Sequence, residues 1–415
     1  MNSYSKARIP QRHAHHPPTY SLLFFLKYSS TLVELFSIRR VQSSSSGGGS
    51  RFFLMAVSIC TTDLENIMRI SHKSSSWLHK NFAPLKFRAL QFRVASHTHR
   101  NLSRVSIELR HSKADIAGSI IEISKNSRNQ LEVEMDRGWL HSKTGFSTAW
   151  RRIGAFIDIL STKNVPPGRW RVDLGDWVTQ DGPVAGFCSA YPQTTLFPDR
   201  GFTNSAGYMK QRYMALQGPH WFTRKPYIVW RGGPNGHGLC SKAQMDWRDQ
   251  TIRQRVRLCL LSQQLQNADR TLPIDCAITP SPRDNSLPVQ RLREVGIVGT
   301  RIPSNSWLQY QFAIDIDGNA NAFTNFFTRL LFGCCILKIS SPYNFQQWYY
   351  HRLKPWVHFI PVATNLTNFE ERIRWCFDHP QQCYDIARAG QALAFSLTYR
   401  QERRHMIKSL AAATI

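Results

Sequence analysis

Acidic residues are scarce in this chain of 415 residues: 27 Asp and Glu stand against 53 Lys and Arg, giving a formal net charge of +26. Such an excess favours anionic partners, so nucleic acid, phosphorylated small molecules and acidic membranes are all candidates. About half of the excess lies in residues 1–114, and the rest of the sequence contains no Lys/Arg block or Arg-Gly repeat. Because such runs follow a phosphate backbone, their absence disfavours nucleic acid as the partner.

Closely paired cysteines are also missing. The nine cysteines include no Cys-x-x-Cys pair, so neither a zinc site nor a redox motif is indicated. Buried free thiols are the simpler interpretation, and a few disulfides are the alternative for a chain in a secretory lumen. In that compartment Asn101-Leu-Ser and Asn365-Leu-Thr would be glycan acceptors.

No run of about 20 apolar residues occurs, so a membrane-spanning helix is not predicted. The apolar patch at 20–36 is interrupted by two charged residues, and the Ser/Gly run at 43–50 is typical of a flexible linker. The short apolar run at 52–60 resembles a signal-peptide core. We expect residues 1–60 to be a targeting or low-complexity segment: a cleaved or anchoring secretory sequence, a transit peptide or a wrongly assigned start.

From about residue 80 onward, β-prone runs alternate with helical patterns, which predicts an α/β fold of two lobes with a ligand cleft outside the strand ends. Strands are expected at 105–109, 170–174, 227–230, 312–315 and 335–339. Helices are expected at 114–123, 148–160, 243–267, 323–332, 369–379 and 382–407. We place the N-terminal lobe at 61–215, the C-terminal lobe at 216–370 and C-terminal helices at 371–415.

A glycine-rich turn follows one predicted strand, in the sequence Trp230-Arg-Gly-Gly-Pro-Asn-Gly. Backbone N–H groups at Gly232 and Gly233 and the guanidinium of Arg231 could approach a phosphate closely. Neither the dinucleotide fingerprint nor the P-loop spacing is present. A plain surface turn with a solvated arginine is therefore the alternative interpretation.

A second polar turn joins a strand to an amphipathic helix, in the sequence Asp315-Ile-Asp-Gly-Asn-Ala-Asn. The helix N-terminus then lies at a strand end, where its free N–H groups and dipole favour an anion such as a diphosphate. Gly318 is fourth from Asp315, whereas a calcium loop requires glycine at its sixth position, so no metal is expected. Capping by Asp317 or Asn319 is the alternative role for this turn.

Two further segments hold candidate side chains. Trp170-Arg-Val-Asp-Leu-Gly-Asp-Trp ends in an acidic turn, where a carboxylate at the mouth of the cleft could serve as a general base, although an aspartate at a strand end is usually a cap. An aromatic and basic turn surrounds His358, which either packs in a rigid corner or touches a nucleotide or sugar.

Taken in order, these segments resemble glycosyltransferase family 90, over about residues 149–399. That family includes Rumi-type protein O-glucosyltransferases, fungal capsule-associated xylosyltransferases and lipopolysaccharide-modifying relatives. The resemblance rests on the two turns above and on Leu330-Leu-Phe-Gly-Cys-Cys-Ile-Leu-Lys, Gln347-Trp-Tyr-Tyr, Leu353-Lys-Pro-Trp-Val-His-Phe-Ile-Pro-Val and Ile386-Ala-Arg-Ala-Gly-Gln.

The resemblance implies a GT-B fold of two Rossmann-like lobes, with the acceptor-side lobe at 61–215 and the UDP-sugar-binding lobe at 216–370. It also implies a UDP-sugar donor, no tightly bound cofactor, no metal, and inverting transfer of a hexose or pentose, glucose or xylose, to a hydroxyl of a protein or glycan. Asp176 would be the catalytic base. The donor would contact Arg231, Gly232, Gly233, Asp317, Gly318, Asn319, Ala320, Asn321, Ala322, Phe323 and Thr324.

Two positions depart from the family pattern. Thr324 stands where Rumi-like members carry an arginine, and Ser340 or Ser341 stands where an acidic residue is frequent. These departures put one diphosphate contact and part of the sugar recognition in doubt. The alternatives are an inactive family member or a basic nucleic-acid-binding protein. A secretory location, in the endoplasmic reticulum or Golgi, with or without an N-terminal membrane anchor, is the expected compartment.

Overall fold

The computed structural model describes residues 32–40, 52–60, 90, 105–110, 118–142 and 144–412. The chain divides into two units, Met1–Pro84 and Leu85–Ile415. In the first unit, β1 (Leu32–Arg40) pairs antiparallel with β2 (Phe52–Cys60), so the run expected to resemble a signal-peptide core is a strand. The predicted linker at 43–50 and the acceptor site at Asn101 lie outside the described residues. Among those described, no helix is both long and apolar enough to cross a bilayer.

The N-terminal lobe of the second unit is built on a six-stranded sheet of order β3-β5-β4-β6-β7-β8. Its strands are β3 (Val105–Arg110), β4 (Ile120–Lys125), β5 (Leu131–Asp136), β6 (Gly168–Asp173), β7 (Val184–Gly186) and β8 (Thr195–Leu196). β4 runs antiparallel to both of its neighbours, and the other pairs are parallel. Its helices are α3 (Arg137–His141), α4 (Gly145–Leu160) and α5 (Arg200–Asn204).

The helix predicted at 114–123 is wrong, because strand β4 begins at Ile120. Ile121 and Ile123 are buried while the residues between and after them are half-buried, so the burial alternates with the period of a strand. A tight turn with Asn129 at φ 59° then returns the chain into β5. A hairpin of this kind makes the first sheet mixed.

The C-terminal lobe contains a five-stranded, fully parallel sheet of order β10-β9-β11-β12-β13. Its strands are β9 (Lys225–Gly232), β10 (Ile274–Ile278), β11 (Tyr310–Asp315), β12 (Cys335–Ile339) and β13 (Ile360–Val362). Its helices are α6 (Met209–Leu216), α7 (Gln254–Ala268), α8 (Leu287–Glu294), α9 (Phe323–Leu331), α10 (Phe369–Asp378) and α11 (Pro380–Ser396), with short 3-10 turns η2 (Trp221–Thr223), η3 (Ser304–Gln309) and η4 (Tyr350–Arg352). In chain order this is the 2-1-3-4-5 arrangement of a doubly wound fold.

Helices cover both faces of this sheet because its strands are apolar on both sides. Ile228 and Phe312 belong to the same buried cluster as residues of α7, α10 and α11. Val229 and Ala313, one position further along each strand, belong to the cluster that includes α9. The expected α/β fold of two lobes, followed by C-terminal helices, is thus confirmed.

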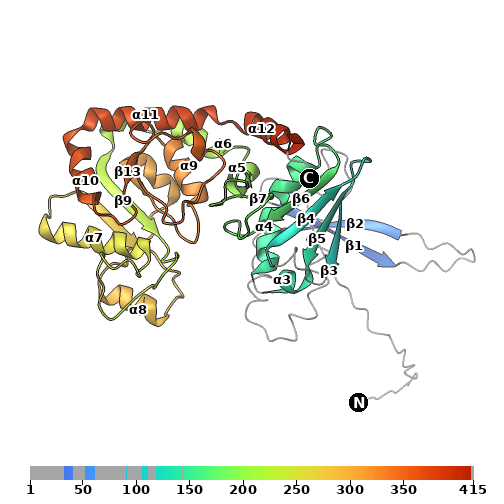
Figure 1. The fold of residues 1–415 in the computed structure, drawn as a ribbon, viewed down its shortest axis with the longest axis horizontal. Coiled ribbons are helices and arrows are strands. Elements are labelled where there is room, and N and C mark those ends of the chain that lie inside the picture. The colour runs from blue at the N-terminus through green and yellow to red at the C-terminus, as the bar shows by residue number, and fades with distance from the viewer. Residues whose placement is uncertain are drawn as a thin grey trace, which may run out of the picture. The chain divides into compact units, whose positions relative to one another are not determined.

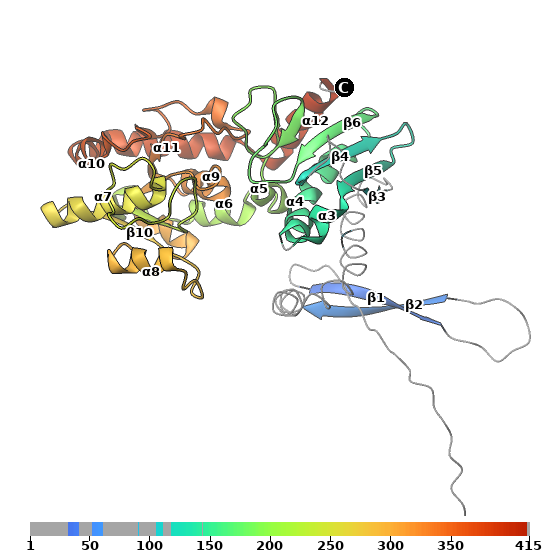
Figure 2. The ribbon, with the colours of Figure 1, turned by 60° about the horizontal axis from the view of Figure 1, so that its bottom comes forward.

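The chain returns to the N-terminal lobe at its end. The predicted helix at 382–407 is two helices, α11 and α12 (Tyr399–Ala412), separated at Leu397 and Thr398. Asp158 of α4 accepts hydrogen bonds at Oδ2 from the Tyr399 hydroxyl, at 2.7 Å, and from Arg403 Nε, at 3.2 Å. Figures 1 and 2 both show α12 beside the six-stranded sheet while α11 lies along the parallel one.

Candidate functional site

The predicted site residues gather where parallel strands β9, β11 and β12 end. Because parallel strands expose their carboxyl ends at one edge of a sheet, the loops that follow them are neighbours. The glycine turn after β9 contains Gly232 and Gly233, and the segment 317–324, here called the donor loop, connects β11 to α9. A third segment, 340–347, follows β12.

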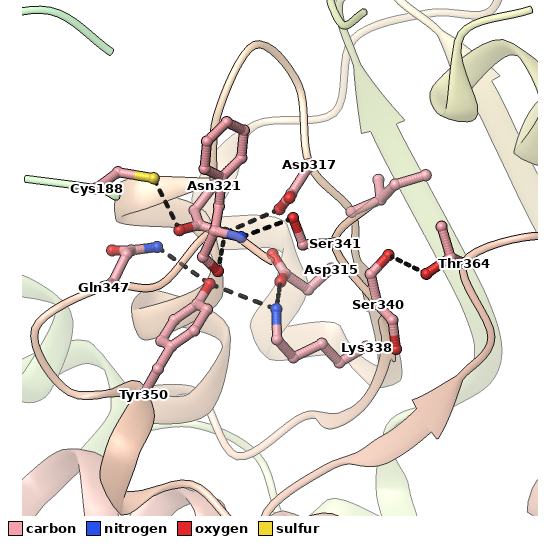
Figure 3. Close-up of polar contacts among 12 residues, drawn as sticks. Cys188, Asp315, Asp317, Asn321, Lys338, Ser340, Ser341, Gln347, Tyr350 and Thr364 are labelled. Atoms are coloured by element: carbon pink, nitrogen blue, oxygen red, sulfur yellow. Dashed lines mark hydrogen bonds and ion pairs between the residues drawn. The ribbon is translucent and has the colours of Figure 1, made fainter. Parts of the chain in front are cut away.

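Asn321 fixes the shape of the donor loop. Its side-chain nitrogen donates to Oδ1 of Asp317 at 3.0 Å and to the carbonyl of Phe345 at 3.2 Å. Its side-chain oxygen accepts from the thiol of Cys188, at 3.1 Å, and Cys188 belongs to the N-terminal lobe (Figure 3). Both N–H groups and the oxygen of this buried amide therefore form hydrogen bonds within the protein, so the Asn321 side chain holds the loop in shape.

Two buried carboxylates lie beside one lysine beneath the donor loop. Lys338 Nζ forms an ion pair with Asp315 Oδ2 at 2.8 Å and lies 3.4 Å from the hydroxyl of Tyr350 (Figure 3). Burial raises the pKa of Asp317, and the nearby Lys338 and the hydroxyl of Ser341 partly offset this rise by stabilising the charged form. Ser341, one of the two serines that stand where an acidic residue is expected from the family resemblance, thus lies near Asp317.

Arg255, at the start of α7, supports the donor loop from below and was not predicted from the sequence. Its guanidinium donates to the carbonyl of Asp317 at 2.8 Å and to that of Ile316 at 3.2 Å. A Cβ atom on Gly318 would lie 2.8 Å from Arg255 Cζ, so only glycine leaves room for the guanidinium. No sequence feature distinguishes Arg255 from the other arginines between 248 and 257.

Arg231 makes its contacts at the neighbouring strand rather than within the donor loop. Its guanidinium pairs with Oδ2 of Asp275 at 2.6 Å and donates to the carbonyls of Asp275, Trp230 and Thr300 at 2.8, 2.9 and 3.0 Å. The solvated arginine of the alternative interpretation is not observed, since this side chain is only 10% exposed. Contact between Arg231 and a donor phosphate stays a prediction.

The glycine turn is tight, and its outer part contacts the donor loop. A Cβ atom on Gly232 would lie 2.5 Å from the ring of Trp230, and one on Gly233 would lie 2.6 Å from Asn235 Oδ1. His237 Nε2 lies 2.9 Å from the carbonyl oxygen of Asn319. Because an imidazole N–H can donate to that carbonyl, His237 joins the glycine turn to the donor loop, a role that the sequence did not indicate.

The acidic turn after β6 contains two aspartates with different roles, Asp173 and Asp176. Asp173 is buried and accepts hydrogen bonds from Ser119 Oγ at 2.7 Å, from the Gly175 amide at 2.7 Å and from Thr179, so it stabilises the turn. Asp176 is 36% exposed, pairs at Oδ1 with Arg152 Nη2 at 2.5 Å, and accepts at Oδ2 from the Asn319 amide at 3.3 Å. The structure brings this candidate base against the donor loop.

Helix α9 begins at Phe323 without a side-chain cap. The predicted capping by Asp317 or Asn319 is wrong, because those side chains bond to Asn321 and Asp176. Ala320 is buried, and Ala322 occupies the cap position, where a methyl group accepts no hydrogen bond. An uncapped N-terminus of this kind leaves backbone N–H groups at the donor loop for an anion.

Thr324, in the first turn of α9, is linked to the N-terminal lobe. Its hydroxyl lies 3.2 Å from the hydroxyl of Tyr208, which donates to Asp199 Oδ1 at 2.9 Å. Asp199 also caps α5 through the amides of Gly201 and Phe202. The position where the family pattern has an arginine is thus part of a hydroxyl and carboxylate network.

Four aromatic rings pack together beside Asp176 and Asn319: Trp177 follows Asp176 in sequence, and His237 contacts the carbonyl of Asn319. Ring centroids are 5.3 Å apart for Trp177 and His237, 4.4 Å for His237 and Tyr343, and 5.9 Å for Trp177 and Phe345. Tyr343 is 47% exposed, so part of this cluster is accessible to solvent.

The remaining candidates have structural contacts. His358 Nδ1 accepts the backbone N–H of Lys354 at 2.9 Å, which supports the rigid-corner interpretation. The eight cysteines from Cys188 onward are free, and all except Cys240 are buried. In the described part of the chain, no three His, Cys, Asp or Glu side chains are grouped so as to hold a metal ion.

Comparisons with known proteins agree with the resemblance found in the sequence. The family model "Glycosyl transferase family 90" matches residues 181–400. "Uncharacterized protein 179R" of Invertebrate iridescent virus 6 is 29% identical over 193 residues, 43% of this chain and 16% of that protein. "Protein O-glucosyltransferase 2" of Danio rerio is 26% identical over 260 residues, 58% of this chain and 46% of that protein.

The chain therefore spans less than half the length of either relative. Among solved structures, Anabaena Alr3699/HepE in complex with UDP-glucose aligns with 50% of this chain and 53% of its own at 11% identity, with a TM-score of 0.29. Because the family model covers more than half of the 415 residues, this chain belongs to glycosyltransferase family 90.

Proposed function

We propose that this chain is an inverting O-glycosyltransferase that moves glucose or xylose from a UDP-sugar to a hydroxyl group. The hydrogen bond from Asn319 to Asp176 Oδ2 is the observation that supports the proposal most. It joins the donor loop of one lobe to the candidate base of the other, two groups that an inverting transfer needs on opposite sides of one sugar ring.

In the proposed reaction the acceptor hydroxyl attacks the anomeric carbon, and its proton passes to Asp176 Oδ2. The bond between the anomeric carbon and the diphosphate oxygen breaks, and its electron pair leaves with UDP. Arg152 occupies Oδ1 of the same carboxylate, so Oδ2 is the oxygen available to the acceptor. A positioned general base contributes roughly 10²- to 10⁴-fold in rate.

The departing diphosphate needs positive potential, and the donor lobe supplies it with backbone groups. The uncapped N-terminus of α9 and the N–H groups of Gly232 and Gly233 are the proposed diphosphate contacts. Arg255, half-buried beneath the donor loop, adds a positive charge nearby. Together these groups support a mechanism without a metal ion or another cofactor.

The proposal extends to the acceptor and to the cellular compartment. The names of the relatives, protein O-glucosyltransferases of Danio rerio and Homo sapiens, favour glucose and a hydroxyl on a protein, with a glycan hydroxyl as the alternative. A protein acceptor of this kind is consistent with residence in the endoplasmic reticulum or Golgi.

The test combines donor binding with turnover. UDP, UDP-glucose, UDP-xylose, UDP-galactose and GDP-mannose are titrated while the melting temperature is recorded, since a ligand of the native state raises it. We expect UDP and one UDP-sugar to stabilise the protein. Asp176→Asn is expected to retain this stabilisation and to lose release of UDP in the presence of acceptor.

Asp181→Asn is the matched control, because Asp181 lies on the same loop and its carboxylate bonds only to the amide of Gly182 among the contacts described. Wild-type turnover by Asp176→Asn would overturn the assignment of the base. Failure of every UDP-sugar to bind the folded protein would overturn the proposal itself. In that case the net charge of +26 favours a nucleic-acid-binding protein. Binding of RNA by the full chain that weakens as salt is added would support this alternative.

A further inference from the structure

We infer that Arg152 is the positioning residue for the base: it holds one oxygen of Asp176 so that the other faces the donor loop. The inference rests on the proposed function and adds a residue outside every motif of the family resemblance. Arg152 lies on α4, a helix of the N-terminal lobe, 24 positions before Asp176.

Two hydrogen bonds fix the guanidinium. Nη2 donates to Asp176 Oδ1 at 2.5 Å, and Nη1 donates to the carbonyl of Leu174, in the same turn, at 2.8 Å. Because a planar guanidinium presents its N–H groups at fixed angles, one anchored nitrogen sets the direction of the other. The carboxylate of Asp176 is consequently held in one orientation relative to its own backbone.

The held orientation matters because the two carboxylate oxygens have different neighbours. Oδ1 is occupied by Arg152, whereas Oδ2 accepts, within the described part of the chain, only the longer bond of 3.3 Å from Asn319. An acceptor hydroxyl can replace that weaker contact and deliver its proton to Oδ2. Without Arg152 the side chain of Asp176 could rotate, and in part of the population Oδ2 would no longer face the donor loop.

Arg152 also lies near the start of α9. Its Cζ is 6.0 Å from the ring centroid of Phe323, the first residue of that helix. The side chain is 22% exposed, so its charge is partly shielded from water. Arg152 therefore bonds to the base and lies near the start of α9, and among the described residues none of its hydrogen bonds reaches the donor loop.

The adjacent Arg151 is a matched control. It is exposed, and among the described residues its guanidinium bonds only within its own helix, to the carbonyl and hydroxyl of Ser147 at 3.0 and 2.6 Å. Arg151→Ala and Arg152→Ala thus remove the same group from consecutive positions of α4. Only the second loses contact with Asp176.

The experiment measures kcat, the KM for the UDP-sugar and the UDP-induced melting shift in the full chain. For Arg152→Ala we expect kcat to fall about 10- to 100-fold, because misplacement of a catalytic group by about 1 Å costs up to about 10². KM and the melting shift should stay within about twofold, since donor contacts remain. Millimolar guanidinium should restore part of kcat, and Arg152→Lys should keep part of it.

A double variant tests whether Arg152 affects kcat through Asp176. If Arg152 acts through the base, Asp176→Asn with Arg152→Ala is no slower than Asp176→Asn alone. Unchanged kcat in Arg152→Ala, or equal losses in Arg151→Ala, would overturn the inference while leaving Asp176 as the base. Full activity of Asp176→Asn, or the absence of any transfer by the wild-type chain, would instead overturn the proposed function and this inference with it.

Discussion

The guanidinium of Arg255 lies directly against Gly318, so that a Cβ atom at residue 318 would be 2.8 Å from Cζ. The two residues are 63 positions apart, and the guanidinium can lie here because residue 318 has no side chain. Glycine admits the arginine, and the arginine satisfies the carbonyls of Ile316 and Asp317 at the turn. A buried carbonyl without a donor would cost about 1–3 kcal/mol.

Gly318→Ala is therefore expected to weaken donor binding. The added methyl group pushes Arg255 away from the carbonyl of Asp317, and the donor loop changes shape. We expect the dissociation constant of UDP to rise at least about tenfold, equivalent to 1.4 kcal/mol, measured by calorimetric titration. Gly138→Ala is the control, because an added Cβ there meets only Asp136 Oδ1, at 3.3 Å. Unchanged UDP affinity in Gly318→Ala would contradict the role of this pair.

Arg231→Ala is expected to lower stability more than donor affinity. Its guanidinium holds Asp275 and the carbonyl of Thr300, and its removal leaves those acceptors without their donor. We expect the free energy of unfolding to fall by about 1–3 kcal/mol, measured by urea denaturation. If UDP instead binds tenfold more weakly to the folded variant, Arg231 reaches the diphosphate as the family resemblance implies.

Thr324→Arg is expected to strengthen UDP binding several-fold. Thr324 is the second residue of α9, where an added guanidinium could pair with a bound diphosphate. The cost is the contact with Tyr208 and the unfavourable placement of a cation at a helix N-terminus, each about 0.3–1.5 kcal/mol.

Asn325→Arg, at the next exposed position of the same turn, gives the matched comparison. It adds an equal charge without replacing the hydroxyl that meets Tyr208. If both variants bind UDP equally well, the gain reflects general electrostatic attraction and not a specific contact at residue 324.

Because the Cys188 thiol is buried, we expect the free energy of unfolding to fall at alkaline pH. Burial raises the pKa of Cys188 to about 12 from the ordinary value of 9.0. Between these values the unfolded chain releases the thiol proton and the folded chain keeps it, so the free energy of unfolding falls as the pH rises from about 9. Below pH 9 neither state is ionised and the effect is absent.

Cys188→Ser separates this effect from those of other groups, because a serine hydroxyl can donate to Asn321 but does not ionise in this range. We expect the wild-type melting temperature to fall more steeply than that of the variant between pH 9 and 10.5. Parallel curves would show that Cys188 is not buried as described.

Local pattern was sufficient to predict most strands of the parallel sheet and helix α9. Residues 312–314 of β11 form a continuous apolar run, and apolar residues recur at helical spacing from Phe323, so both elements follow from neighbours in sequence. The hairpin of β4 and β5 was missed because short apolar runs fit a helix or a strand equally well, and pairing with β6 decides between them. β10 and β13 are short strands that depend on the sheet beside them.

The sequence by itself determined the family, the order of the motifs and the side chains available for chemistry, because these depend on residues close together in the chain. Only the tertiary structure decided which of those side chains meet. Asp176 contacts Asn319 across 143 positions, Arg255 supports a loop 62 positions away, and Arg231 turns to Asp275. The physical reason is that hydrogen bonds and ion pairs act over about 3 Å, and only the packing of strands and helices brings distant residues within that range.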